Sequence, residues 1–164
     1  MNDTIFNAKE IFEIAIQIEK NGEQFYARAA EIAADPQLKK ALQRLRAMES
    51  EHGGIFRKLD KTLEKELMGS FHFDPEGQQG LYLKAIANSH VFSTDIDVHE
   101  ILNEHNSPQE ILDMAIRFEK DSIMYFLGMK EIVPEELGKG QIEQLIQEEQ
   151  GHVLYIMEEI APLI

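Results

Sequence analysis

The stretches AMESEHGG (47–54) and QEEQGH (147–152) each place a glutamate and, three residues later, a histidine inside a helical pattern. Glu49 and His52 stand where the surrounding apolar period calls for leucine, and Glu149 and His152 repeat the arrangement one hundred residues later. Side chains three residues apart lie on the same helix face, one turn from each other. Both stretches therefore predict helices whose inward faces carry a carboxylate and an imidazole.

The repeat extends well beyond these two motifs. Identical residues recur at an offset of one hundred: Glu10/Glu110, Ile11/Ile111, Ala15/Ala115, Ile16/Ile116, Glu19/Glu119, Lys20/Lys120, Glu31/Glu131, Ile32/Ile132 and Leu45/Leu145. Two copies are too few for a solenoid, so the pattern indicates a duplicated helical hairpin.

Start and stop signals give the bounds of the expected helices. We expect four long helices, over residues 8–33, 37–67, 107–132 and 137–160. Asp35-Pro36 interrupts the first pair, and Ser107-Pro108 opens the second with an N-cap serine and a proline at the first helical position. Residues 68–106 form a long crossover, in which 79–91 and 96–105 could each be a short helix. A crossover of this kind returns the chain to the starting end of a bundle. We therefore predict one all-α domain over residues 1–164, a four-helix bundle of two repeated hairpins.

Composition narrows the function classes. Hydrophobic residues make up 43% of the chain and charged residues 28%, which is typical of a globular protein, and the net charge is −14. An acidic surface repels nucleic acids and anionic membranes, so we expect neither as a partner. No cysteine is present, which excludes disulfides, thiolate metal sites and a catalytic thiol. The start MNDTIFNAKE does not resemble a signal peptide and no apolar run approaches ~20 residues, so we expect a cytoplasmic location.

Each long helix carries an apolar stripe that a glutamate interrupts. Glu19 and Glu49 each lie fifteen residues from position 34, beside the first turn, and Glu119 and Glu149 each lie fifteen residues from Pro134. In an antiparallel hairpin, equal distances from the turn mean equal levels, about 22 Å along the axis at 1.5 Å per residue. The four carboxylates and the two histidines can therefore meet at one buried level.

Four unpaired buried carboxylates would cost several kcal/mol each, so protons or metal ions must compensate them. Two divalent ions would neutralise four carboxylates, and the two imidazoles would add neutral nitrogen ligands. Oxygen-rich ligation with histidine and without sulfur suits iron or manganese, or a mixed pair, better than zinc. Surface carboxylates or a protonated, metal-free polar core remain the alternatives.

The sequence resembles the rubrerythrin-like branch of the ferritin-like di-iron carboxylate proteins. The segments AIQIEKNGEQFY (15–26) and AIRFEKDSIMYF (115–126) look like the first and third helices of that family, and AMESEHGGIF (47–56) and IQEEQGHVLYI (146–156) like the second and fourth. The resemblance implies a ferritin-like bundle with two iron ions. It assigns as ligands Glu19, Glu49, His52, Glu119, Glu149 and His152, with Glu49 and Glu149 bridging the metals.

Several features of this chain depart from the family or extend its pattern. Rubrerythrins usually carry an extra glutamate one turn beyond the third-helix ligand, where this chain has Ser122. Glu23, one turn past Glu19, is a candidate substitute, although a solvated position is the alternative. Tyr26 shares the stripe of Glu19 and is a candidate to hydrogen-bond a ligand or pass an electron. A four-cysteine rubredoxin-like domain, which often supplies electrons in this family, is missing, so a separate donor protein is expected.

The resemblance implies an oxidoreductase that reduces hydrogen peroxide or dioxygen at the metal pair, in defence against oxidative stress, and a homodimer. Two alternatives stay open. A ferroxidase or iron-handling protein would use iron as its substrate, and a non-enzymatic helical bundle would keep the metal for structure alone. Ferritin-like bundles host many chemistries, so the fold does not choose among them.

Overall fold

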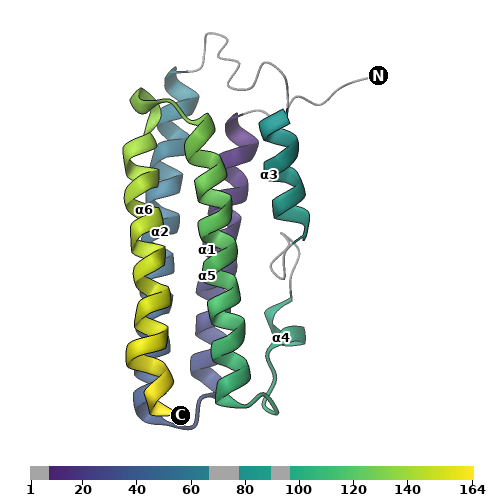
Figure 1. Cartoon of the computed structure of the whole chain (residues 1–164), viewed down its shortest axis with the longest axis vertical. Helices are drawn as coiled ribbons and strands as arrows, with labels where there is room; N and C mark the ends of the chain where they lie inside the picture. The colour runs from purple at the N-terminus through teal and green to yellow at the C-terminus, as the bar shows by residue number, and fades with distance from the viewer. Residues whose placement is uncertain (1–7, 67–77, 90–96) are drawn as a thin grey trace.

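A computed structural model describes residues 8–66, 78–89 and 97–164 of the chain. Within these ranges the regular elements are helical, and four long helices run side by side as a bundle (Figure 1). The all-α fold class predicted from the sequence is confirmed. None of the helices in these ranges is both long and apolar enough to cross a membrane.

The first hairpin consists of α1 (Ala8–Ile32) and α2 (Pro36–Glu66). Asp35 fixes the turn because its Oδ1 accepts hydrogen bonds from the backbone N–H groups of Gln37 and Leu38, each at 2.8 Å. Pro36 occupies the first helical position, where an N–H would have no partner within the helix. The two helices pack along their length, so residues equally distant from the turn lie at the same level (Figure 1).

The second hairpin consists of α5 (Pro108–Ile132) and α6 (Lys139–Tyr155), joined through the short 3₁₀ helix η1 (Glu135–Leu137). A capping box opens α5: the Ser107 N–H donates to Glu110 Oε2 at 2.7 Å, and the Glu110 N–H donates to Ser107 Oγ at 3.2 Å. Gly138 lies between η1 and α6 with a φ of 107°. A Cβ at Gly138 would also lie 2.6 Å from Leu59 Cδ2, so this turn requires glycine.

The last helix differs from the expected range of 137–160. Its α-helical part ends at Tyr155, and the chain continues as the π-helical turn η2 (Ile156–Ile160) and the 3₁₀ turn η3 (Ala161–Leu163). Pro162 gives a physical reason for the change. It lacks the N–H that an α-helix would donate to the carbonyl of Glu158, so the α-helical pattern cannot continue through it.

Two short helices belong to the crossover. α3 (Gln78–Ser89) packs against α5, where a Cβ at Gly128 would lie 2.8 Å from Leu83 Cδ2. α4 (Val98–Ile101) is a single turn, so the expectation of a helix over 96–105 was too long. The chain leaves helical geometry because Asn106 Oδ1 accepts from the Asn103 N–H at 2.8 Å, which stabilises a turn instead. The remainder of the crossover, 67–77 and 90–96, lies outside the described residues.

The apolar core has two parts, one on each side of a polar level. The upper cluster lies at the end of the bundle where α1 and α6 begin and α2 and α5 end (Figure 1). Its buried residues include Phe12, Phe56, Phe126 and Leu145. The lower cluster gathers their counterparts at the other end, among them Phe25, Leu42, Phe118 and Ile156. The polar residues of the four long helices are therefore enclosed by hydrocarbon above and below.

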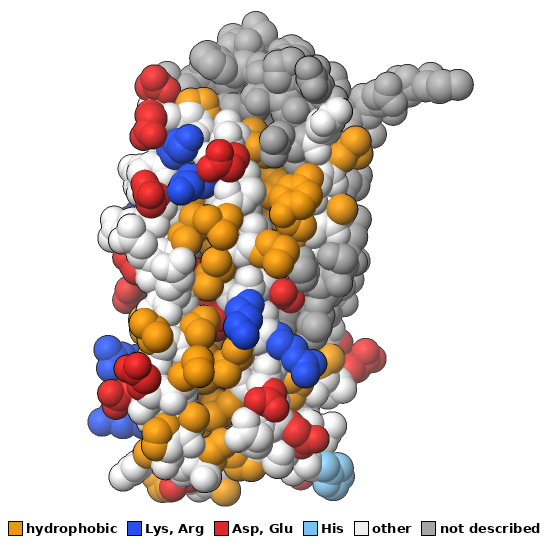
Figure 2. Space-filling model, viewed as in Figure 1, with side chains coloured by type: hydrophobic (Ala, Val, Ile, Leu, Met, Phe, Trp, Pro, Cys, Tyr) orange, Lys and Arg blue, Asp and Glu red, His pale blue; other side chains and the backbone are white. Residues whose placement is uncertain are grey.

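The visible surface mixes hydrophobic and charged side chains. Figure 2 shows hydrophobic side chains running lengthwise over the face formed by α5, α6 and α3, with acidic and basic groups between them. Exposed large residues of these helices include Tyr82, Leu127 and Leu154. The homodimer expected from the resemblance stays a prediction.

Candidate metal centre

Six ionisable side chains meet in the middle of the bundle, and the four long helices all contribute to them. The set comprises Glu19 from α1, Glu49 and His52 from α2, Glu119 from α5, and Glu149 and His152 from α6, all at 2% exposure or less. The structure thus brings together all six residues that the sequence suggested as ligands. Their role as ligands stays a prediction.

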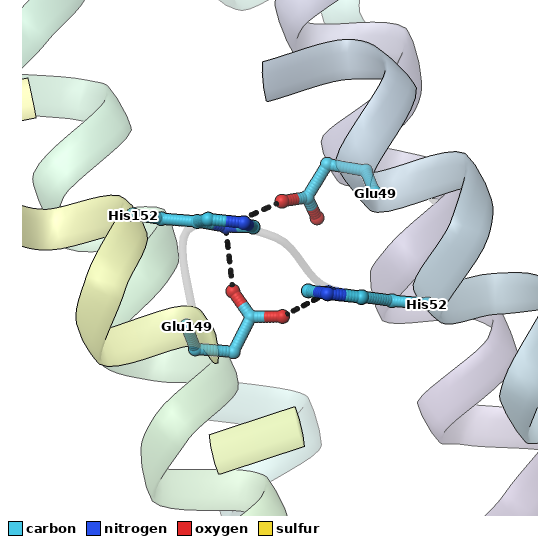
Figure 3. Close-up of side chains that lie close together, drawn as sticks. All are labelled: Glu49, His52, Glu149 and His152. Carbon is cyan, nitrogen blue, oxygen red and sulfur yellow. Dashed lines mark hydrogen bonds and ion pairs between the residues drawn. The ribbon is translucent and has the colours of Figure 1, made fainter. Parts of the chain in front are cut away.

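The two histidine rings lie parallel at the centre of this cluster. Their centroids are 5.1 Å apart and their planes differ by 7°. Glu149 lies between the rings, as Figure 3 shows: its Oε1 is 2.6 Å from His52 Nδ1 and its Oε2 is 3.1 Å from His152 Nδ1. Glu49 approaches from the opposite side, with Oε1 at 3.1 Å from His152 Nδ1. One ligand atom from each of these four residues can be chosen so that all lie within 4.8 Å of one another.

The two remaining glutamates each accompany one histidine. Glu19 Oε2 is 3.6 Å from His52 Nδ1, and Glu119 Oε2 is 3.3 Å from His152 Nδ1. The cluster therefore has two halves, Glu19 with His52 and Glu119 with His152, and Glu149 contacts both. This is the arrangement that two metal ions joined by a bridging carboxylate would need.

Unpartnered atoms provide a test of whether the residues fit metal ions. Within the described part of the chain, both carboxylate oxygens of Glu19 are buried without a hydrogen bond, and Glu49 Oε1 and Glu149 Oε2 compete with Glu119 for the single Nδ1 of His152. Leaving a charged oxygen buried and unpaired is costly, and coordination to a cation removes the cost. Oxygen-rich ligation with two imidazoles suits iron or manganese. The residues present therefore fit a pair of such ions.

Burial dominates the ionisation of three of the carboxylates. Loss of solvation, followed by repulsion from Glu149, raises the pKa of Glu19 well above 4.5 and that of Glu49 from 4.5 to about 7. Loss of solvation and then repulsion from Glu49 raise the pKa of Glu119 well above 4.5. These groups favour the protonated form until positive charge is placed beside them.

The histidines supply that positive charge when no metal is bound. Burial disfavours the charged form of His152, but hydrogen bonds to Glu119, Glu149 and Glu49 raise its pKa far above 6.5. Burial likewise opposes the charge of His52, whose hydrogen bond to Glu149 raises its pKa above 6.5. Burial also opposes the charge of Glu149, yet hydrogen bonds from His152 and His52 lower its pKa well below 4.5. In the metal-free protein, protons on the carboxylates and positive charge on the imidazole rings thus compensate the buried carboxylates, as metal ions would.

Tyr26 and Glu23, the two further candidates from the sequence, lie in different surroundings. The buried Tyr26 hydroxyl donates a hydrogen bond to Glu119 Oε1, so this tyrosine touches the cluster directly. Glu23 is 34% exposed and pairs with Arg46 at 3.6 Å, so the structure does not bring it into the cluster. Ser122 is buried, but its hydroxyl donates to the Phe118 carbonyl at 3.1 Å and does not stand in for a carboxylate.

Glu148 of α6, next to Glu149 in the chain, is a further acidic residue in contact with the cluster. Its Oε2 lies 2.9 Å from His52 Nε2, on the outer side of the ring, although its side chain is 40% exposed. The partner is a histidine of another helix, and no spacing within one helix predicts such a contact. The sequence marks this position only by a break in the repeat, since the residue equivalent to Glu148 in the first hairpin is Met48.

A comparison with protein families agrees with this geometry. The family model for rubrerythrin matches residues 4–85, half of the chain. The chain belongs to the rubrerythrin family. The matched segment carries Glu19, Glu49 and His52, and the second half of the cluster follows from the repeat and from the structure. Searches among curated proteins and among solved structures found no match.

Proposed function

We propose that this rubrerythrin-family chain is a non-haem di-iron oxidoreductase that reduces hydrogen peroxide with electrons from a separate donor protein. The observation that supports it is the enclosed cluster of four carboxylates and two imidazoles, with oxygens that lack hydrogen bonds. Glu19 and His52 would hold one ion, Glu119 and His152 the other, and Glu49 and Glu149 would lie between them. A bound ferrous pair would supply the two electrons that reduction of peroxide requires.

The surrounding residues favour redox chemistry at a protected site. Apolar clusters above and below keep bulk water from the carboxylates, which strengthens their interaction with cations. The hydrogen bond from Tyr26 fixes the orientation of Glu119 and leaves its Oε2 facing His152. Reduction of one peroxide to two waters also consumes two protons, and the acidic and imidazole groups of the cluster can hold protons.

Peroxide kinetics test the proposal. The protein is loaded anaerobically with ferrous iron, freed of excess metal and mixed with hydrogen peroxide, and iron oxidation is followed by absorbance. Glu49→Ala should react far more slowly, because a buried ligand is lost. Glu51→Ala, which removes an exposed carboxylate two residues away, is the matched control and should react as the wild type does. Equal rates in all three proteins would contradict the proposal.

The same experiment separates the iron-handling alternative. In a ferroxidase, iron is the substrate and leaves the site after oxidation. Continued oxidation beyond two irons per chain, with growth of a ferric mineral, would favour that function over peroxide reduction. Oxidation that stops at two irons until a reductant is added would favour the oxidoreductase.

A further inference from the structure

The outer nitrogens of the two histidines have different surroundings. Both rings turn Nδ1 toward the carboxylates of the cluster, so Nε2 faces outward. His52 Nε2 lies 2.9 Å from Glu148 Oε2. His152 Nε2 is buried and has no hydrogen-bond partner in the described part of the chain. The internal repeat is thus broken at this point.

Glu148 is itself held in place. Its Oε1 accepts a hydrogen bond from Gln144 Nε2 at 2.9 Å, one turn earlier on α6. A continuous set of contacts therefore runs from Gln144 through Glu148 and the His52 ring to Glu149. The repeat equivalent of Glu148 is Met48, whose uncharged thioether sulfur is only a weak hydrogen-bond acceptor.

We infer that Glu148 is a positioning residue for His52, and that it makes the metal position at Glu19 and His52 bind more tightly than the position at Glu119 and His152. The inference rests on the proposed metal pair and adds an order of filling to it. An imidazole that binds metal through Nδ1 carries its proton on Nε2. At His52 that proton has a carboxylate acceptor, which fixes the ring orientation and makes the ligand more basic. At His152 the same proton has no acceptor and remains buried.

Stepwise metal binding provides the first test. Metal-free protein is titrated anaerobically with Co²⁺, and bound metal is measured by equilibrium dialysis with elemental analysis. The wild type should bind two ions in two steps of unequal affinity. Glu148→Ala should weaken the tighter step about 10–100-fold, the range typical for loss of a carboxylate behind a metal-binding histidine. Glu148→Gln, which keeps an oxygen acceptor, should weaken it less.

A matched control separates the hydrogen bond from the loss of charge. Glu143→Ala removes a carboxylate of the same helix that is 57% exposed and pairs with Lys130. Both binding steps should be unchanged in this variant. The NMR signals of the His52 ring nitrogens in metal-free protein give a second readout without any metal. They should shift in Glu148→Ala and stay in place in Glu143→Ala.

The outcomes distinguish this inference from the proposed function. Two ions bound by the wild type, with both steps unchanged in Glu148→Ala, would overturn the role of Glu148 and leave the metal pair standing. Two equal steps in the wild type would overturn the order of filling. Failure of the wild type to bind two ions would overturn the proposed function and this inference with it. If Glu148→Ala does not fold, Glu148→Gln decides by the same criteria.

Discussion

Gly22 lies one turn beyond Glu19 on α1, and its replacement tests how tightly the centre is packed. A Cβ at Gly22 would collide with Glu49 Oε2 and would lie 2.5 Å from Phe118 Cε1. Phe118 cannot yield easily, because its ring is 1% exposed and stacks on Phe25 with centroids 6.3 Å apart. Gly22→Ala must therefore displace a core ring, a proposed metal ligand, or both.

The magnitude follows from a matched pair of substitutions. Alanine in place of glycine inside a helix normally stabilises by roughly 0.5–1 kcal/mol. Gly151 lies inside α6 with nothing within 4 Å of its added Cβ, so Gly151→Ala should show this gain. Gly22→Ala should stabilise its helix by the same amount, but it also overpacks the core, which typically lowers the stability by about 1–3 kcal/mol. The two variants should therefore differ by about 1–3 kcal/mol, with Gly22→Ala the less stable.

Thermal unfolding of the two metal-free variants measures this difference. For a chain of this size, 1 kcal/mol corresponds to about 2–4 °C, so the Tm values should differ by roughly 2–12 °C. Iron binding adds a second readout, because displacement of the Glu49 carboxylate should weaken it in Gly22→Ala and not in Gly151→Ala. Equal Tm values together with equal iron binding would refute the close packing of α1 against Glu49 and Phe118.

Three further predictions concern the charges of the centre. Tyr26→Phe removes a buried hydrogen-bond donor to Glu119, so it should lower the stability of the metal-free protein by about 1–3 kcal/mol and also weaken iron binding. The control Tyr125→Phe loses a hydrogen bond to the Ile11 carbonyl and should lower stability alone. Unchanged iron binding in Tyr26→Phe would contradict the contact between Tyr26 and Glu119. Glu19→Gln should stabilise the metal-free protein at pH 8 by roughly 1–3 kcal/mol and weaken iron binding, since a buried carboxyl without hydrogen bonds must either carry an unpaired charge or hold a proton above its usual pKa, and an amide does neither. Chemical unfolding and metal analysis measure the two effects, and lower stability would count against the burial argument. The third is a pH dependence. Because the folded pKa of Glu49 is about 7 against a reference of 4.5, the metal-free protein should lose about 3 kcal/mol as pH rises between those values. The raised pKa values of His52 and His152 act in the same direction above pH 6.5, where the unfolded chain releases protons that the folded histidines keep. Between pH 5 and 8 the Tm of the metal-free protein should therefore fall as the pH rises. With saturating iron the Tm should rise, because iron competes better with protons at high pH. A metal-free Tm that rises over this range would contradict the raised pKa values of these groups.

The cluster could be predicted from the sequence because two regular patterns constrain it. Helical periodicity placed Glu49 and His52 on one face, and the repeat placed Glu149 and His152 on the equivalent face of another helix. Equal distances from Asp35-Pro36 then fixed the level of Glu19 and Glu49 within the first hairpin. Each of these arguments uses only spacing along the chain, which is what a single sequence contains.

The features that escaped prediction depend on contacts between helices or on single hydrogen bonds. Glu148 of α6 contacts His52 of α2, and spacing along the chain does not reveal a contact between two helices. Glu23, one turn from Glu19, pairs with Arg46 outside the cluster, so the sequence left two positions open for it and the folded chain has the one away from the cluster. The early end of α4 depends on the Asn103 turn. Local polar contacts of this kind compete with helix formation and are decided only in the folded chain.

Metal content per chain tests the central claim most directly. Protein loaded anaerobically with ferrous iron and freed of excess metal is analysed for iron by elemental analysis, beside Glu49→Ala and Glu149→Ala. The account predicts two irons per chain in the wild type and a sharp loss in both variants. A folded wild-type protein without stoichiometric metal would show that the six residues form a protonated polar core, and the oxidoreductase would have to be abandoned.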